Sequence, residues 1–162
     1  MAKKDDAAEG DPVEAFYGKL QEKYKLPNFQ DIFADFELHS IDDTALLLAE
    51  IRKKMVDKLD QFTMMLQPVL QPDTTINDLH ECRFFSEEEK RPLNDLYARL
   101  MALIKRGLKA SVTMKEKDDA EYIIAVASQY AELKKSMTNV AERLEAGWKK
   151  AEETEEGQWY VG

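Results

Sequence analysis

Apolar residues recur every three or four positions along the last long stretch of the chain. The repeat consists of Ile123, Val126, Tyr130, Leu133, Met137, Val140, Leu144, Trp148 and Ala151. This spacing places one apolar stripe along roughly nine turns of an α-helix. Such a stripe is stable only where other helices cover it, so the pattern predicts a helical bundle with a long C-terminal helix over residues 118–151.

The same period marks the N-terminal part of the chain. Asp11 as a cap, Pro12 at the first helical position and Glu14 three residues after the cap predict a helix start. Leu26–Pro27 predicts the end of this helix. Residues 28–38 carry large apolar residues at helical offsets, which favours a short second helix that covers one end or side of the bundle. These residues are Phe29, Ile32, Phe33 and Phe36.

A long third helix is predicted from a cap at Ser40 or Asp42 to about Gln71. Its main apolar face consists of Leu48, Ile51, Met55, Leu59, Phe62, Leu66 and Val69. Leu46 and Met64 fall on the opposite side of this helix. We expect the first helix or the segment over residues 28–38 to pack there, because large apolar side chains are rarely left in water as a group.

Two more helices are predicted before the final one. Pro72–Thr75 is a turn that leads into a short helix over residues 76–82. Ser86 and Glu89 have the spacing of a capping box, and Pro92 then either kinks the helix that follows or begins it. The seam of that helix is Leu96, Leu100, Leu103 and Gly107. Residues 111–117 are the expected connection to the final helix, which a cap at Asp118 or Asp119 begins.

These elements together predict an all-α protein. We expect an antiparallel helical bundle of about four main helices plus one or two short helices, with a long C-terminal helix. A chain of 162 residues is long enough to bury one core. The expected organisation is a flexible polar leader over residues 1–10, a single bundle domain over 11–151 and an acidic-aromatic tail over 152–162.

Composition supports a soluble helical protein in a reducing compartment. Hydrophobic residues make up 44% of the chain and charged residues 34%, as is typical of amphipathic helices. No export signal and no apolar run long enough to cross a membrane is found. Cys82 is the one cysteine, which excludes an internal disulfide. We therefore expect a cytoplasmic protein without membrane contact.

Charge is distributed unevenly along the chain, whose net charge is -9. Residues 1–50 hold 5 basic and 12 acidic side chains, residues 51–117 hold 13 and 10, and residues 118–162 hold 5 and 10. Net negative charge repels phosphate backbones, which disfavours general nucleic-acid binding. Association with nucleic acid through the central basic zone remains a third hypothesis for function.

Few residues of this chain could form a metal, cofactor or catalytic site. Neither His39 nor His80 completes the Glu-x-x-His element of di-iron bundles, since Phe36 and Asn77 stand where the glutamate would be. Cys82 is expected to be a small buried apolar residue rather than a reactive thiol. No catalytic, cofactor-binding or metal-binding residue is predicted.

A second hypothesis for function is an enzyme that works as all-α nucleotide pyrophosphohydrolases do. In those enzymes paired carboxylates on bundle helices hold magnesium around a triphosphate. The candidate pairs are Asp57 with Asp60 and Glu142 with Glu145. At 100° per residue most of these side chains face away from the bundle interior, which favours an acidic face in solvent instead.

Two features are better suited to binding a protein partner. Lys105, Arg106 and Lys109 lie opposite the leucine seam of their helix and, with Lys115 and Lys117, form a local positive zone. The alternative is that these side chains pair with acidic neighbours in the same chain or in a second one.

The second feature is the tail. Glu152, Glu153, Glu155 and Glu156 precede Trp159 and Tyr160. Adjacent aromatic side chains are strong interface anchors, and they either bind a partner or fold back on the bundle.

These observations favour a non-catalytic interaction or scaffold protein over an enzyme. The partner is a protein, and one candidate is a second copy of this chain. Homodimerisation through the final helix is the leading quaternary hypothesis, because a repeat of that length exceeds what the shorter helices cover.

Overall fold

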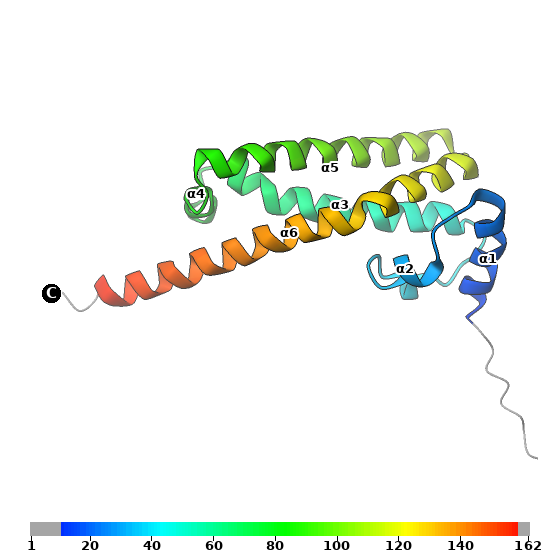
Figure 1. Cartoon of the computed structure of the whole chain (residues 1–162), viewed down its shortest axis with the longest axis horizontal. Helices are drawn as coiled ribbons and strands as arrows, with labels where there is room; N and C mark the ends of the chain where they lie inside the picture. The colour runs from blue at the N-terminus through cyan, green and yellow to red at the C-terminus, as the bar shows by residue number, and fades with distance from the viewer. Residues whose placement is uncertain (1–10, 159–162) are drawn as a thin grey trace, which may run out of the picture. The chain divides into compact units, whose positions relative to one another are not determined.

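A computed structural model describes residues 11–158, with side chains over residues 11–154 (Figure 1). Every regular element in that range is helical, which confirms the all-α bundle. The elements are α1 (Pro12–Tyr24), α2 (Phe29–Phe33), the short 3₁₀ helix η1 (Leu38–Ser40), α3 (Leu47–Leu70), α4 (Ile76–Arg83), α5 (Glu87–Thr113) and α6 (Glu116–Gln158). The four main helices are α1, α3, α5 and α6, as expected from the periodicity.

The chain divides into two compact units. Unit 1 comprises Met1–Met55 and Gly107–Ala127, and unit 2 comprises Val56–Arg106 and Ser128–Gly162. Helices α3, α5 and α6 each contribute residues to both units. Each unit has its own core, and the two are described separately below.

Unit 1 buries part of the apolar side chains of α1 and α2, whereas Phe16 on α1 is exposed. Val13, Tyr17 and Leu20 on α1 are buried, as are Phe29 and Ile32 on α2. Asp11 caps α1 as predicted, because its carboxylate accepts a hydrogen bond from the backbone N–H of Val13 at 2.9 Å. The hydroxyl of Tyr17 donates to the Pro27 carbonyl at 2.8 Å, and burial raises its pKa.

One ion pair in unit 1 is withdrawn from solvent. Nε of Arg52 on α3 lies 2.6 Å from Oδ1 of Asp119 on α6, and the two side chains are 13% and 7% exposed. Burial raises the pKa of Asp119 even though Arg52 opposes the shift. A buried carboxylate and guanidinium depend on each other, because either one alone would be a buried uncompensated charge.

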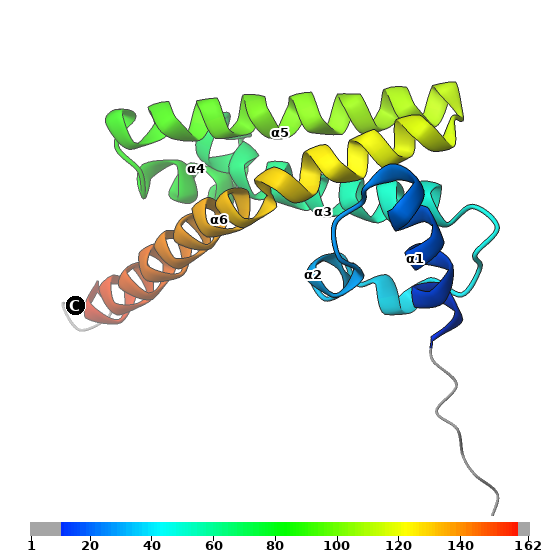
Figure 2. The same cartoon turned by 45° about the vertical axis from the view of Figure 1, so that its right-hand side comes forward.

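Unit 2 is built on the predicted seams of α3, α5 and α6. Its buried residues include Leu59, Leu66, Val69, Leu96, Leu100, Leu133, Met137 and Val140. The seam of α6 is covered as far as Val140. Beyond it Leu144 and Ala151 are half-buried and Trp148 is 36% exposed. The last turns of α6 extend away from the other helices of this unit in both views (Figures 1 and 2).

The segment around α4 docks on this part of α6 through a glycine. A Cβ atom at Gly147 would lie 2.5 Å from Cγ and 2.7 Å from Cε2 of Phe84, so only glycine lets the ring approach so closely. The Phe84 ring packs edge-on against Trp148, with centroids 5.6 Å apart. Trp148 Nε1 donates to Glu81 at 3.0 Å, and Arg143 Nε donates to the Phe84 carbonyl at 3.1 Å.

The capping box before α5 is confirmed, and α5 runs through Pro92. The backbone N–H of Ser86 donates to Glu89 at 2.7 Å, and the N–H of Glu89 donates to Ser86 Oγ at 3.2 Å. Proline removes one backbone hydrogen bond in the second turn. The helix continues because the capping box fixes its first turn and Leu96 and Leu100 anchor the following turns in the core.

Four predicted boundaries differ from the structure. Helix α3 begins at Leu47 rather than after a cap at Ser40 or Asp42, because Ser40 belongs to η1 and residues 41–46 form a loop and a turn. The connection between the last two helices is residues 114–115 rather than 111–117, since Met114 in the left-handed conformation ends α5. Residues 28–38 form α2 and part of η1 instead of one helix, because Glu37 also has a positive φ. Helix α6 continues past residue 151 to Gln158.

The expected cover over Leu46 and Met64 is wrong. Leu46 is 69% exposed in unit 1 and Met64 is 64% exposed in unit 2. Helices α1 and α2 instead pack against each other in unit 1, where the ring centroids of Tyr17 and Phe29 lie 5.2 Å apart. Single exposed apolar side chains are tolerated by folded proteins.

Acidification is expected to loosen α1 from α6. Glu116 Oε1 accepts from the Tyr24 hydroxyl at 2.7 Å and from Lys23 Nζ at 3.0 Å, and these hydrogen bonds hold the Glu116 pKa below its usual 4.5. A lowered carboxyl pKa contributes stability above about pH 4.5 and loses it as the pH falls through the folded-state value. Thermal unfolding between pH 6 and pH 3 should show a smaller loss in Tyr24→Phe than in the wild type; an equal loss would contradict this role.

Candidate functional site

The strongest candidate for an interaction surface lies where α5 ends and α6 begins. Five residues of unit 1 define this surface, which we call the α5 tip: Leu108, Lys109, Val112, Met114 and Lys115. Val112 is 81% exposed and Met114 is 86% exposed, more than any other large hydrophobic side chain described. Lys109 and Val112 lie three positions apart on α5 and share its solvent face.

Met114 combines an exposed apolar side chain with a backbone conformation that favours glycine. Met114 has φ of 52°, in the left-handed region that favours glycine, and its N–H donates to the Ala110 carbonyl at 3.1 Å. A side chain costs roughly 1 kcal/mol there relative to glycine. An apolar side chain in solvent gains nothing from burial that would offset this cost. Met114 is therefore unfavourable for the stability of this chain in both respects.

The two lysines of the tip, Lys109 and Lys115, are not neutralised by acidic side chains in the described part of the chain. Over residues 11–154, neither Lys109 nor Lys115 forms an ion pair, whereas Lys117 lies 3.7 Å from Glu121. Lys105 and Arg106, on the preceding turn of α5 in unit 2, are exposed and form none either. Of the five basic residues of the predicted positive zone, Lys117 pairs with an acidic neighbour, and the other four form no ion pair with the side chains that the structure describes.

The aromatic part of the tail lies outside the described residues. Trp159 and Tyr160 follow directly after Gln158, the last residue of α6. Glu152 and Glu153 lie on exposed turns of α6, so the first part of the predicted tail is helical.

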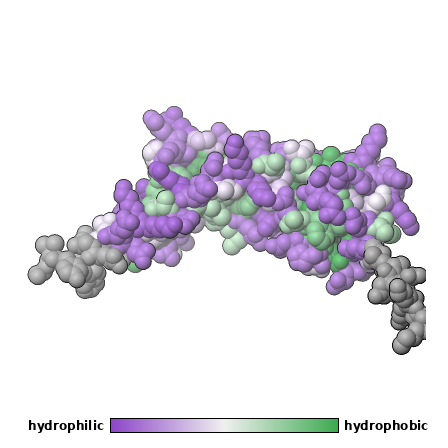
Figure 3. All heavy atoms as spheres, turned by 60° about the horizontal axis from the view of Figure 1, so that its bottom comes forward, coloured by the Kyte–Doolittle hydropathy of each residue, from purple (hydrophilic) through white to green (hydrophobic). Residues whose placement is uncertain are grey.

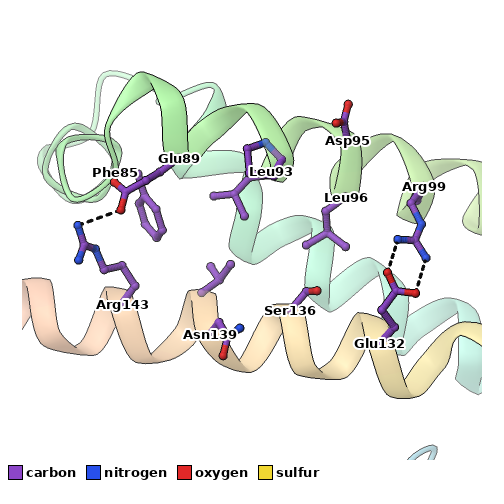
Figure 4. Close-up of a pocket in the computed structure, with 12 residues that line it drawn as sticks. Phe85, Glu89, Leu93, Asp95, Leu96, Arg99, Glu132, Ser136, Asn139 and Arg143 are labelled. Atoms are coloured by element: carbon purple, nitrogen blue, oxygen red, sulfur yellow. Dashed lines mark hydrogen bonds and ion pairs between the residues drawn. The ribbon is translucent and has the colours of Figure 1, made fainter.

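Unit 2 holds a groove between α5 and α6 with a volume of about 560 Å³ (Figure 4). Its apolar lining includes Phe85, Leu93, Leu96 and Val140. Leu93 and Leu96 project from α5 toward α6, whereas Asp95 points away from the groove. The apolar lining is suited to an apolar side chain, but it does not by itself specify which molecule would enter.

Charged residues at the two ends of the groove are already paired. Arg99 contacts Glu132 at 2.8 and 3.4 Å, and Arg143 lies 3.4 Å from Glu89. The hydrogen bond from Arg99 lowers the Glu132 pKa. No histidine, cysteine, lysine or tyrosine lines the groove. Two of its three carboxylates, Glu89 and Glu132, are therefore held in ion pairs with arginines.

The carboxylates proposed for a pyrophosphohydrolase mechanism are exposed. Asp57, Asp60, Glu142 and Glu145 all lie on the solvent side of their helices in unit 2. Glu145 forms an ion pair with Lys149 one turn along α6. Among the described residues no cluster of three histidine, cysteine, aspartate or glutamate side chains could hold a metal ion. The geometry brings no pair of these carboxylates into a pocket.

The side chains of His39, His80 and Cys82 contact other side chains within the fold. The His39 ring lies 6.3 Å from that of Phe33, and the His80 ring lies 5.6 Å from that of Trp148. Cys82 is half-buried, and Lys90 Nζ donates to its sulfur at 3.3 Å. The sequence did not indicate this contact, because Lys90 lies beyond the turn that ends α4.

Comparison with protein families, with curated proteins and with solved structures gave no match. Over the described residues, no helix combines the length and the apolarity needed to cross a bilayer. One face of the molecule shows hydrophilic side chains over most of its surface, with apolar patches between them (Figure 3).

Proposed function

We propose that this chain is a non-catalytic interaction protein that binds a protein partner through the α5 tip. The observation that carries this proposal is the exposure of Val112 and Met114 beside the unpaired Lys109 and Lys115. Exposed apolar side chains gain free energy when a partner covers them. Lysines beside them favour a partner of acidic character and repel a basic one.

A photo-reactive side chain placed at the tip tests this proposal. We expect benzoylphenylalanine at Val112 to form a protein adduct in a lysate of the native cells. The matched control is the same side chain at Leu46, which is also exposed in unit 1 but has no lysine within three residues. The Leu46 variant should give at least about tenfold less adduct, because a surface without complementary charge attracts an acidic partner less.

Competition and nuclease treatment complete the experiment. Excess wild-type protein should suppress the adduct, and excess Lys109→Glu/Lys115→Glu protein should not, because reversed charge repels an acidic partner. Equal labelling at positions 112 and 46 would contradict the proposal. So would loss of the adduct after nuclease treatment, which would assign the tip to nucleic acid instead.

A further inference from the structure

We infer that the occupant of the α5 tip is the acidic-aromatic segment of a second copy of this chain, residues 152–162. This inference rests on the proposed function, since it names the partner of the same surface. It joins two copies tip to tail. The tip and the tail segment are complementary in charge and in apolar character.

The charges of the two segments are opposite. Around the tip, residues 107–117 contain three lysines and one glutamate. Glu116 is engaged by Lys23 and Tyr24, and Lys117 by Glu121, so Lys109 and Lys115 are the basic side chains here without an ion pair to residues 11–154. Residues 152–162 contain four glutamates and no basic residue. Where their side chains are described, at positions 152 and 153, these glutamates are exposed and form no ion pair with residues 11–154. Each segment thus offers charge that the other lacks.

The apolar groups also match. Val112 and Met114 present two flexible or branched apolar side chains with little cover. Trp159 and Tyr160 supply large aromatic groups within a few residues of the glutamates. Methionine and aromatic side chains make favourable contacts, and aromatic residues are the commonest anchors at protein interfaces. The N-terminal leader fits less well, because residues 1–10 hold two lysines, three acidic residues and no aromatic residue.

The length of α6 favours a second copy, rather than the same copy, as the source of the segment that occupies the tip. This helix begins at Glu116, directly after the tip, and continues for 43 residues to Gln158. A helix of that length measures about 64 Å at 1.5 Å per residue. Four further residues reach at most about 14 Å when fully extended. Within one copy, the tip that precedes α6 and the segment that follows its last residue are separated by one continuous helix, so a neighbouring copy supplies the missing half.

Light scattering of the full chain over about 10 to 500 μM tests the inference. We expect the contact between tip and tail to be weak, with a dissociation constant in the micromolar range. The average mass should rise above the monomer mass with concentration, and each copy offers both halves of the contact, so assemblies larger than a pair are allowed. Higher salt should reduce association, because exposed charges are screened.

Met114→Gly provides the sharpest variant. Glycine suits the left-handed backbone and removes the apolar side chain, so thermal stability should rise while association weakens by about tenfold or more. Lys25→Gly is the matched control, because Lys25 has φ of 56° at the end of α1 in the same unit. It should also raise stability, and it should leave association unchanged. A gain in stability together with a loss of association cannot come from misfolding.

A peptide of residues 150–162 separates the remaining outcomes. It should bind the wild-type chain and bind Lys109→Gln/Lys115→Gln about tenfold more weakly, with Lys19→Gln/Lys53→Gln as a charge-matched control. A monomeric mass at every concentration together with no peptide binding would overturn the inference. Association that survives Met114→Gly or deletion of residues 157–162 would also overturn it, because the contact would then lie elsewhere.

The experiments also distinguish failure of this inference from failure of the proposed function. If the mass stays monomeric and the peptide does not bind, but position 112 still forms a competed adduct with another protein, the tip is an interaction surface with a different partner. If position 112 forms no competed adduct, both proposals fail. If the peptide binds only a chain lacking residues 157–162 and the mass stays monomeric, the tail occupies its own copy and the second copy is excluded.

Discussion

Replacing Asp119 by asparagine is expected to destabilise unit 1 by about 3–5 kcal/mol. The substitution leaves the Arg52 guanidinium buried at 13% exposure without its counter-charge. Urea unfolding followed by circular dichroism measures the loss, and amide exchange in α1 and in the first turns of α6 should show that it is concentrated in unit 1. A loss under about 1 kcal/mol would mean that water reaches Arg52 and that the pair is effectively a surface one.

The double variant Arg52→Met/Asp119→Leu separates burial of charge from packing. Because desolvation raises the Asp119 pKa, ionising this carboxyl is harder in the folded chain than in water. An apolar pair of similar volume should therefore recover most of the stability that Asp119→Asn loses. A double variant as unstable as the single one would show that the ion pair also positions α3 against α6 in a way that apolar packing does not replace.

Alanine at Gly147 and alanine at Gly18 are expected to have opposite effects. Both glycines are inside helices, so alanine adds about 0.5–1 kcal/mol of helix stability at either site. At Gly18 nothing lies within 4 Å of the new methyl group, whereas at Gly147 it would overlap the Phe84 ring. Overpacking of this kind costs about 1–3 kcal/mol. The helix contributions cancel between the two variants, so their difference in unfolding free energy measures the packing of Phe84 against α6.

Tryptophan fluorescence reports the same change locally. Displacing Phe84 removes the edge-on contact with Trp148 and should shift the emission of Gly147→Ala to longer wavelength. Trp159→Phe in both backgrounds leaves Trp148 as the one remaining tryptophan. Equal stabilisation by the two alanines would contradict the docking of α4 described here, since it would mean that Phe84 does not lie against Gly147.

The helical spacing of apolar residues predicted the helices of this fold, because that spacing determines which side chains are buried along each seam. Val126, Tyr130 and Leu133 are buried as the repeat in the final helix requires. Local capping rules placed the start of α1 and identified the capping box before α5, since Asp11 and Ser86 act within their own turn, whereas Pro92 left the start of α5 open. The positive φ of Met114 was not predictable, because methionine has no preference for that conformation and the sequence shows no glycine there.

The contacts that position α4 also could not be predicted from the sequence. Gly147 and Phe84 are 63 residues apart, and neither residue type by itself indicates the other. The basic part of the α5 tip was predictable, since Lys109 and Lys115 belong to the positive zone expected from the sequence. Its apolar part was missed because Val112 and Met114 fell in the expected connection, where side-chain exposure does not follow from periodicity. Charge thus indicated the surface, and the structure added the side chains that make it apolar.

The central claim is that the α5 tip binds an acidic-aromatic segment. NMR spectra of the methionine methyl groups test this claim most directly. The chain has seven methionines, which include the exposed Met64 and Met114 and the buried Met55 and Met137. With the methionine methyl groups labelled by ¹³C, adding the peptide of residues 150–162 should shift the Met114 resonance and leave Met64, Met55 and Met137 in place. A Met114 resonance that does not move, or shifts of equal size at Met64, would contradict the account.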